Sequence, residues 1–413
     1  MKDTYLYDFN KERYRTLGEM AIPCKKELSF EIVEDGYLLP KRYADGFLFG
    51  NGGVLDKNRK YIEASQMNSY AKYTKVIEET DEKEIYLGGT YSFAENTVVY
   101  LNEEVVYLGY LSNHWGHFLT DSTTRLYAFL ENADKNKKYA YLLDEGSDGT
   151  LVENVERFLE LLGIREQIIF VSQVTRCPRI VIPEQAYVAN SFYSNAFLNV
   201  FEKVASAVDC QKYPVYKKVY FSRRKFGKAR KSEFGEEILL NLFKKNRFKM
   251  ISPERCTLDE QIAIIRNASC VAGIIGTITH NLLFAQPEKQ MLIINKTHNF
   301  NIIQRDMNQI CRADAIYIDA YLAKFGVGIG DGPFLLYYSE PLDKFVRDNK
   351  MRSVDAWYKG RMRLKRNSKR YERQYYLKAG KHVKLRYGKN KERYNYFAPE
   401  HLQKYEQEIN RKT

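Results

Sequence analysis

Short apolar runs alternate with amphipathic segments from about residue 105 onward, which predicts strands alternating with helices. The runs at 139–143, 167–171 and 179–182 are short enough to be buried strands. Between the first two, residues 151, 155, 158, 159 and 162 share one face of a predicted helix that ends at Gly163. Thr150 and Glu153 have the spacing of a capping box, which predicts that this helix begins after Thr150.

A second series of the same kind starts near residue 217. Its predicted strands are 217–221, 248–251, 269–275 and 290–295. Its predicted helices are 233–246, a segment ending near Asn267 that opens with a capping box at Thr257 and Glu260, and 279–285. Each series predicts a parallel sheet with helices on both faces, so we expect an α/β protein with two Rossmann-like domains.

The predicted domain limits follow from these two series. Residues 1–100 are β-rich with glycine turns and join the first series (105–205) in an N-terminal domain, 1–205. Residues 206–340 form the second domain, and 341–413 form a basic, aromatic-rich extension. Ligands of such sheets bind beyond the carboxyl ends of the strands, so we expect a cleft between the two domains to hold the ligand.

Charge separates the extension from the rest of the 413-residue chain, whose net charge is +13. Residues 341–413 hold 22 Lys and Arg against 8 Asp and Glu, or +14, so the remaining residues sum to −1. Such a segment predicts contact with an anionic membrane surface. Nucleic-acid binding, a solvated extension and an oligomer contact are the alternatives.

The termini and cysteines predict a cytoplasmic location, with a peripheral place on the inner membrane face as its extension. No run approaches a membrane span, and the first residues lack the apolar segment of a secretory signal. The six cysteines form no CxxC pair, which favours reduced thiols in the core.

Three short segments carry candidate chemistry, and the first is Ser112–Asp121. His117 and Asp121 are four residues apart, one helical turn, so the pair can accept a proton, and His114 lies beside them. The structural alternative is that Asp121 caps a helix over Ser122–Glu131. A zinc site is disfavoured because the HExxH pattern is missing.

The other two segments follow predicted strands of the second domain. Ser222, Arg223 and Arg224 open a basic turn that suits a diphosphate, unless it is a solvated loop. Gly276 precedes a predicted helix start whose backbone N–H groups at Thr277, Ile278 and Thr279 suit an anion, unless the glycine only avoids a clash. Together the three segments predict a nucleotide-diphosphate ligand across the cleft between the domains.

In this order, the three segments resemble glycosyltransferase family 61, once catalogued as a domain of unknown function. The family patterns match His117-Phe-Leu-Thr-Asp121, Ser222-Arg-Arg-Lys225, Pro253-Glu254 with Glu260-Gln261, and Gly276-Thr-Ile-Thr-His-Asn281 with Phe284. The resemblance covers roughly residues 30–300. The chain departs from the family pattern at Lys231-Ser-Glu233, at Ile275 and at His114.

The resemblance implies a GT-B fold and an inverting transfer of a sugar from a nucleotide donor, usually a UDP-sugar, without a bound metal or other cofactor. Bacterial members resemble enzymes of capsular or other surface polysaccharides. Asp121 is the preferred base, with His117 positioning it or the acceptor; His117 as base is the alternative, and His114 is a further catalytic candidate.

The remaining expected ligand contacts fall into two groups. The donor-binding residues are Ser222, Arg223, Arg224, Gly276, Thr277, Ile278, Thr279, His280 and Asn281. The nucleotide-binding residues are Pro253, Glu254 and Gln261. The expected partners are a nucleotide sugar and a glycan acceptor, with a lipid-linked acceptor as one form. A nucleic-acid-binding protein and a catalytically silent sugar-binding protein are the alternative functions.

Overall fold

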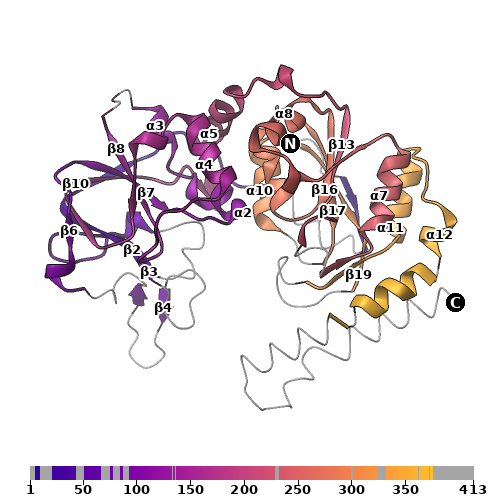
Figure 1. Cartoon of the computed structure of the whole chain (residues 1–413), viewed down its shortest axis with the longest axis horizontal. Coiled ribbons are helices and arrows are strands. Elements are labelled where there is room, and N and C mark those ends of the chain that lie inside the picture. The colour runs from indigo at the N-terminus through magenta and orange to yellow at the C-terminus, as the bar shows by residue number, and fades with distance from the viewer. Residues whose placement is uncertain are drawn as a thin grey trace, which may run out of the picture. The chain divides into compact units, whose positions relative to one another are not determined.

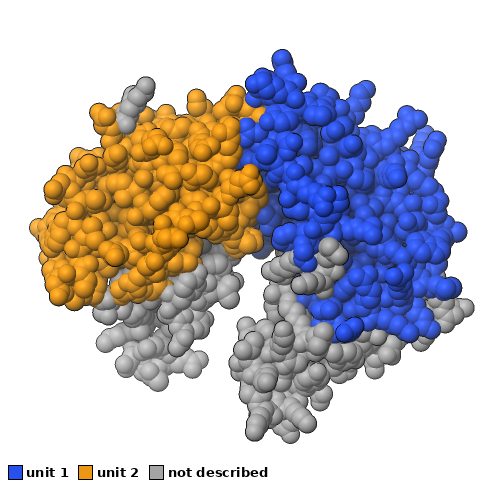
Figure 2. Space-filling model, viewed as in Figure 1, with its two compact units in different colours: residues 1–20, 209–413 blue, residues 21–208 orange. Residues whose placement is uncertain are grey.

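The computed structural model describes most of the chain between Tyr5 and Gln374. The described residues are 5–9, 21–42, 51–66, 75–77, 84–86, 93–132, 134, 136–227, 232–298, 301–323, 332–360, 362–371 and 373–374. The chain divides into two compact units (Figure 2): unit 2 is residues 21–208, and unit 1 is residues 1–20 with 209–413. Unit 1 therefore includes the first residues of the chain, which sequence patterns assign to the other domain.

Unit 2 is built on a seven-stranded sheet in the order β3-β2-β10-β7-β8-β9, with β6 paired to β10 (Figure 1). The strands are β2 (Phe30–Arg42), β3 (Asn51–Leu55), β6 (Val99–Tyr100), β7 (Val105–Tyr110), β8 (Lys138–Leu142), β9 (Ile168–Val171) and β10 (Thr175–Pro183). The predicted strands 139–143, 167–171 and 179–182 are confirmed, and β7, β8, β9 and β10 pair in parallel, as the series from residue 105 predicts. The long strand β2 comes from the β-rich residues before that series and pairs antiparallel with both β3 and β10.

The helices of unit 2 are α2 (Trp115–His117), the π-helical turn η5 (Phe118–Ser122), α3 (Tyr127–Leu130), α4 (Glu153–Leu162) and α5 (Asn195–Ser206). Val155, Phe158, Leu159 and Leu162 are buried, as the periodicity of α4 predicts, and the helix ends at Gly163 with φ 87°. The capping box at Thr150 is wrong: the N-cap is Val152, without a side-chain cap. Asn113 fixes this helix start instead, by donating to the Thr150 carbonyl and accepting from the Val152 amide.

Unit 1 contains a six-stranded sheet, parallel throughout, in the order β1-β18-β17-β16-β13-β15. Its strands are β1 (Tyr5–Tyr7), β13 (Lys218–Phe221), β15 (Lys249–Ile251), β16 (Cys270–Ile274), β17 (Gln290–Asn295) and β18 (Asp314–Asp319). The chain runs from β13 outward to β15, returns to β16 on the other side of β13, and continues through β17 to β18. The strand order therefore reverses between β13 and β16, the position where open α/β sheets bind ligands.

Helices of unit 1 connect these strands (Figure 1): α7 (Glu236–Lys245), α8 (Leu258–Asn267), α9 (Thr277–His280), the 3-10 turn η9 (Asn281–Phe284), α10 (Ile302–Ile310), α11 (Glu340–Asp348) and α12 (Ala356–Lys359). The capping box of α8 is confirmed. The Glu260 amide donates to Thr257 Oγ1 at 3.2 Å, and the Thr257 amide donates to Glu260 Oε2 at 2.8 Å.

The beginning of the basic C-terminal segment belongs to the core of unit 1. In α11, Leu342, Phe345 and Val346 are buried in the cluster that also holds Ile316 and Ile318 of β18. Residue 341, where the sequence predicts the extension to begin, thus lies within a core helix. The few apolar positions of this short helix have little weight in the average composition of residues 341–413, which is basic. Composition therefore places the boundary between the domain and the extension too early.

A small sheet, β14-β20-β19, lies beside the main sheet of unit 1, and it comprises β14 (Glu233–Phe234), β20 (Phe334–Leu336) and β19 (Tyr321–Ala323). Gly235 follows β14 with φ 96°, where a Cβ atom would lie 1.9 Å from the Leu336 carbonyl oxygen. Only glycine fits at this position, so the turn carries β14 directly into α7. No helix among the described residues is long and apolar enough to cross a bilayer.

Candidate functional site

The strand-order reversal of unit 1 brings together two of the predicted segments. β13 leads into Ser222 and Arg223, and its neighbour β16 leads into Ile275 and Gly276. A Cβ atom on Gly276 would lie 3.8 Å from Nη1 of Arg223, so the guanidinium reaches the turn after β16. Residues that are about 50 positions apart in the sequence therefore form one corner at the carboxyl edge of the sheet.

Arg223 is held in place by two buried carboxylates that follow it in the sequence. Its backbone N–H donates to Glu236 Oε1 at 2.9 Å, and its Nε donates to Glu233 Oε2 at 3.0 Å. Glu236 also accepts from the Tyr220 hydroxyl at 3.1 Å, and burial raises the pKa of its carboxyl. With Nε engaged by Glu233, the Nη1 edge of the guanidinium is directed toward Gly276.

Lys296 is a cation of this corner that the sequence analysis missed. It follows β17 and its Nζ lies 2.8 Å from Glu233 Oε1, so Glu233 is shared between Lys296 and Arg223. The side chains of Glu233 and Lys296 are each 4 % exposed. Burial raises the pKa of Glu233, but the charges of Lys296 and Arg223 outweigh it and hold the pKa below its ordinary value.

The other predicted donor-binding residues differ in their exposure to solvent. Arg224 is exposed, and its amide donates to the buried Ser222 hydroxyl at 3.2 Å. Thr277 is half-buried, whereas Ile278, Thr279, His280 and Asn281 are buried. The Thr279 N–H donates to the Gly276 carbonyl at 3.0 Å, so the prediction that this N–H is free for an anion is wrong. The short first turn of α9 uses that donor itself.

One of the predicted nucleotide-binding residues also has a structural role, because its side chain is bound to other parts of unit 1. Gln261 of α8 donates to the carbonyls of Pro253 and Cys256, each at 3.2 Å, and accepts from Asn281 Nδ2 at 3.1 Å. It thus joins α8 to η9 behind the Gly276 turn, while Glu254 lies exposed nearby in the sequence. The capping-box signal at Thr257 and Glu260 predicts the helix start but gives no indication of this bridge.

In unit 2, His117 and Asp121 form the predicted pair. His117 Nδ1 lies 2.9 Å from Asp121 Oδ2, and the side chains are 38 % and 8 % exposed. Asp121 lies inside η5 and does not begin a helix at Ser122, so the capping alternative is wrong. His114 is the N-cap of α2 instead: its Nδ1 accepts from the His117 amide at 3.4 Å, and the two imidazole rings are 4.9 Å apart.

The turn that carries Asp121 is fixed by hydrogen bonds from surrounding side chains. Ser122 Oγ donates to the Tyr110 carbonyl at 2.9 Å, and the Tyr141 hydroxyl donates to the Ser122 carbonyl at 2.6 Å. Arg125 is fully buried, and donates to the carbonyls of Pro183 and Ala64, each at 2.8 Å. These bonds tie an irregular π-helical turn to strands β7, β8 and β10, which supports the position of Asp121.

A further polar group at the carboxyl ends of β7 and β8 was not predicted. Lys41 is 5 % exposed, lies 4.0 Å above the Tyr110 ring, and has its Nζ 3.9 Å from Asp144 Oδ1. The Tyr110 hydroxyl donates to the same Asp144 oxygen at 3.1 Å. Burial lowers the pKa of Lys41. Lys41 is distant from both partners in sequence, so no local pattern could have revealed the group.

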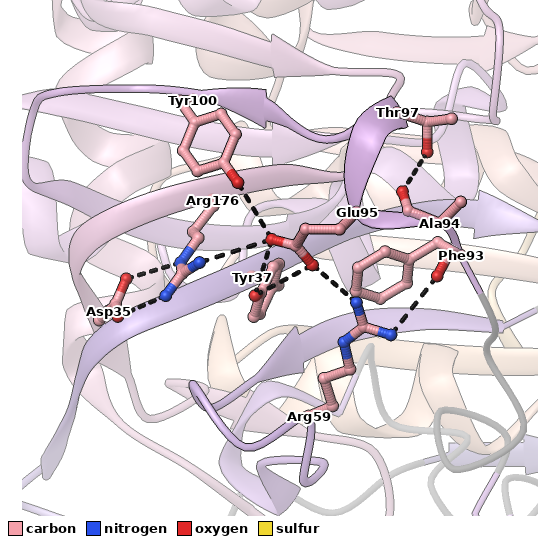
Figure 3. Close-up of polar contacts among 9 residues, drawn as sticks. All are labelled: Asp35, Tyr37, Arg59, Phe93, Ala94, Glu95, Thr97, Tyr100 and Arg176. Carbon is pink, nitrogen blue, oxygen red and sulfur yellow. Dashed lines mark hydrogen bonds and ion pairs between the residues drawn. The ribbon is translucent and has the colours of Figure 1, made fainter.

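The polar network around Glu95 lies elsewhere in unit 2 (Figure 3). Glu95 accepts from Arg59 at 2.6 Å and from the Tyr100 and Tyr37 hydroxyls at 3.0 and 3.2 Å. Arg176 joins it while binding Asp35 through Nε and Nη2. The carboxylates are thus occupied by neighbours in the protein, so this network fastens the segment before β6 to β2 and β10 and is a structural cluster.

Metal sites and reactive cysteines are two further classes of functional site that the described residues can be tested for. No group of three or more His, Cys, Asp and Glu side chains could hold a metal ion there. All six cysteines are free thiols. Burial raises the pKa of Cys177, Cys270 and Cys311 to about 12, so these three are protonated and chemically inert at neutral pH.

Comparison with models of protein families gives a match over the middle of the chain. The model of the family Glycosyltransferase 61 matches residues 115–292. This stretch begins at α2 in unit 2 and ends within β17 of unit 1, so it includes the His117–Asp121 pair and the Arg223–Gly276 corner but not Lys296. The match supports a glycosyltransferase of that family. None of the curated proteins compared matches the chain.

Proposed function

We propose that the protein is an inverting glycosyltransferase, which transfers a sugar from a nucleoside-diphosphate donor, expected to be a UDP-sugar, to a hydroxyl group of a glycan. The observation that carries the proposal is the meeting of Arg223 and the Gly276 turn at the reversal of strand order in unit 1. A diphosphate needs both cationic hydrogen-bond donors and a close approach to the backbone, and this corner supplies the two together.

In the proposed reaction the diphosphate leaves with the electrons of the anomeric C–O bond and gains negative charge. Arg223 contributes planar N–H donors, and Lys296 contributes a second positive charge in a buried setting. Positive groups fixed before the reaction stabilise a leaving anion more than mobile ones do, because they do not have to reorganise. We therefore propose that these cations do the work that a divalent ion does in other glycosyltransferases.

Glu233 is a positioning residue in this proposal. It binds Arg223 through Nε and thereby directs the remaining guanidinium N–H groups toward the Gly276 turn. It also pairs with Lys296, whose side chain is 4 % exposed and whose Nζ lies 2.8 Å from Glu233 Oε1. Glu233 is shared between Arg223 and Lys296, so this one carboxylate does not cancel both of their charges.

The attacking hydroxyl must lose its proton as it forms the new bond to the anomeric carbon. A carboxylate can only accept a hydrogen bond, so in this proposal Nδ1 of His117 donates to Asp121 and Nε2 is the ring nitrogen that accepts the proton of the attacking hydroxyl. Because His117 is the more exposed of the two, we assign proton acceptance to His117 Nε2 and orientation of the ring to Asp121. This reverses the preference that the sequence alone gives.

The finer assignments rest on the family resemblance and on composition. We propose a GT-B arrangement of the two units, a role in bacterial capsular or other surface polysaccharide synthesis, and a cytoplasmic location. The acceptor is a glycan hydroxyl, and a lipid-linked glycan is the form that a surface polysaccharide would require.

Donor binding and transfer can be tested separately with the full chain. We expect UDP and at least one UDP-sugar to raise the melting temperature, because a ligand that binds only the folded state stabilises it. We also expect slow release of UDP from that UDP-sugar in the presence of EDTA. Absence of UDP binding, or loss of turnover on adding EDTA, would contradict the proposal. Binding of a UDP-sugar without any turnover would instead indicate a silent sugar-binding protein.

A further inference from the structure

The helical segment 362–371, which follows α12 in unit 1, has two sharply different faces. Asn367, Ser368 and Tyr371 are buried, and Arg363 and Leu364 are half-buried. The exposed positions are Met362, Lys365, Arg366, Lys369 and Arg370, which recur every three or four residues and form one stripe along the helix. We call this stripe the basic face.

Specific contacts with α7 fix the orientation of the helix. Arg363 Nε donates to Glu237 Oε1 at 2.8 Å, and Asn367 Nδ2 donates to the same oxygen at 2.7 Å. Tyr371 is 3 % exposed at the end of the segment. Since these residues hold the opposite face against unit 1, the basic face is directed to solvent and cannot turn inward without breaking them.

Among the described residues, acidic side chains do not compensate the charge of Lys365, Arg366 and Lys369. No ion pair joins Lys365, Arg366 or Lys369 to an acidic side chain within the described ranges, although many other exposed cations of unit 1 have such partners. Arg370 lies with its guanidinium 5.0 Å above the ring of Phe234. Four cations within two turns of one helix produce a positive potential that attracts a polyanionic surface.

Exposed apolar groups lie at the start of this helix and in α12, which precedes it in the sequence. Met362 is 85 % exposed and Trp357 of α12 is 58 % exposed, the two most exposed large apolar side chains of this part of the chain. Long cationic side chains beside an exposed thioether and an indole are the combination that binds the headgroup region of a bilayer, where apolar groups enter and charges stay at the phosphates.

We propose that the basic face, with Met362 and Trp357, binds the surface of an anionic lipid bilayer. The contacts of Trp357 favour lipid over nucleic acid as the occupant. One face of its ring is covered by the Arg363 guanidinium at 4.4 Å, and Tyr358 packs against it at 4.8 Å and 85°. The ring is therefore poorly placed to stack on a base, whereas insertion of its edge into headgroups needs no free ring face.

The proposal is independent of the transferase reaction and can be tested on the full chain by flotation with vesicles. We expect the protein to float with vesicles of phosphatidylcholine mixed with phosphatidylglycerol and to stay behind with phosphatidylcholine alone. Replacing Lys365, Arg366, Lys369 and Arg370 by Gln should weaken binding by up to about several hundredfold, since each basic residue near an anionic surface contributes about fivefold. Met362→Gln should weaken it by a smaller factor.

Matched variants show whether a loss of vesicle binding comes from the basic face itself, from the lower net charge of the chain or from misfolding. Replacing the exposed Lys26, Lys57, Lys60 and Lys203 of unit 2 by Gln removes the same charge and should leave most of the binding. Lys365→Arg with Lys369→Arg should retain it fully. Both four-residue variants should keep the melting temperature and UDP binding of the original chain. A result that contradicts membrane binding can therefore be told apart from a result that contradicts the transferase proposal.

Three results would overturn the inference. One is flotation that ignores the anionic lipid, and another is equal loss of binding in the two four-residue variants. The third is vesicle binding that survives the loss of the basic face while binding of single-stranded RNA disappears, which would assign the face to nucleic acid.

Discussion

The two units hold their candidate residues by different means. In unit 1, Arg223 and Gly276 lie at the ends of neighbouring strands of a sheet that is parallel throughout, and the fold alone brings them together. In unit 2, Asp121 lies in a π-helical turn that depends on Ser122, Tyr141 and Arg125 for its position. The first site follows from topology, and the second depends on many individual long-range hydrogen bonds.

The charged groups of the two sites also differ in how they are arranged. The corner of unit 1 is a buried cluster in which one carboxylate is shared by two cations, so its charges are fixed before a ligand arrives. The pair in unit 2 joins His117 Nδ1 to Asp121 Oδ2 at 2.9 Å. A fixed positive corner suits the binding of a diphosphate, and a single polarised imidazole suits the transfer of one proton. Variants of the two sites should therefore affect different steps.

The largest effect is expected in unit 2, on turnover. His117→Ala and Asp121→Asn should each lower kcat by about 10²–10⁴-fold while leaving UDP affinity within about twofold, because proton transfer contributes that much. Added imidazole should restore part of the activity of His117→Ala, since it supplies the missing proton acceptor, but not that of Asp121→Asn. Turnover of UDP-sugar and calorimetric UDP binding measure the two quantities.

Asp134→Asn is the matched control for this pair, because it removes a carboxylate from an exposed loop of the same unit. Its turnover should equal that of the original chain. Nearly unchanged turnover in both His117→Ala and Asp121→Asn would remove this pair from the mechanism. Imidazole rescue of neither variant, with both equally slow, would return the base to Asp121.

The next effect is expected in unit 1, on binding. Arg223→Ala should weaken UDP about 10- to 100-fold, as expected for the loss of charge-assisted hydrogen bonds to a phosphate. Arg224→Ala should weaken it by a much smaller factor, because Arg224 is exposed and the guanidinium within 4 Å of a Cβ on Gly276 is that of Arg223. Titration calorimetry with UDP compares the two. Equal losses would mean that the basic turn acts through its overall charge, and the geometry of the corner would then be irrelevant.

This asymmetry explains how much of each unit could be predicted from the sequence. The strands β13, β16 and β17 are short apolar runs, and Gln290–Asn295 coincides with its predicted range. In unit 2 the hairpin pairing of β2 was missed, because strand direction is decided by long-range pairing and leaves no local periodic signal. The edge strand β1 was missed for a similar reason: its partner β18 is about 300 residues away.

The candidate sites show the same limit. Arg223 and Gly276 could be predicted because a basic turn and a glycine each follow an apolar run, and the ends of parallel strands meet at one edge. Lys296 also follows a strand, but a single lysine there carries no distinctive pattern until its contact with Glu233 is seen. Lys41 and Arg125 could not be predicted, since their partners come from segments far away in the chain.

We expect Glu233→Gln to lower the free energy of unfolding by a moderate amount, with a distinctive pH dependence. Because the pKa of Glu233 is lower in the folded than in the unfolded protein, its stabilising charge is complete above about pH 4.5. This stabilisation is lost as the pH falls through the lowered value. The variant should thus be less stable than the original chain at neutral pH, with a difference that narrows in acid. Urea unfolding at several pH values measures it.

The same variant should weaken UDP about tenfold, because Arg223 loses its orienting partner and Lys296 its counter-charge. Glu340→Gln, which removes an exposed carboxylate at the start of α11 in the same unit, is a control for the loss of one carboxylate and should keep UDP affinity. A stability difference that stays constant from neutral to acid pH would show that Glu233 is not ionised in the folded protein. In that case the shared-carboxylate description of the corner would be wrong.

The smallest expected effect concerns the backbone of the corner. Gly276 has φ 146° and ψ −163°, a conformation that costs a residue with a Cβ about 1 kcal/mol or more, although the Cβ itself would meet only Arg223 Nη1 at 3.8 Å. Gly276→Ala should therefore shift the turn rather than block it, and weaken UDP about threefold to fivefold. Gly227→Ala, where a Cβ would meet nothing within 4 Å, should have no effect. If Gly276→Ala bound UDP as tightly as the original chain, the close approach of the diphosphate to this backbone would be excluded, and Arg223 and Lys296 would have to bind it by their side chains alone.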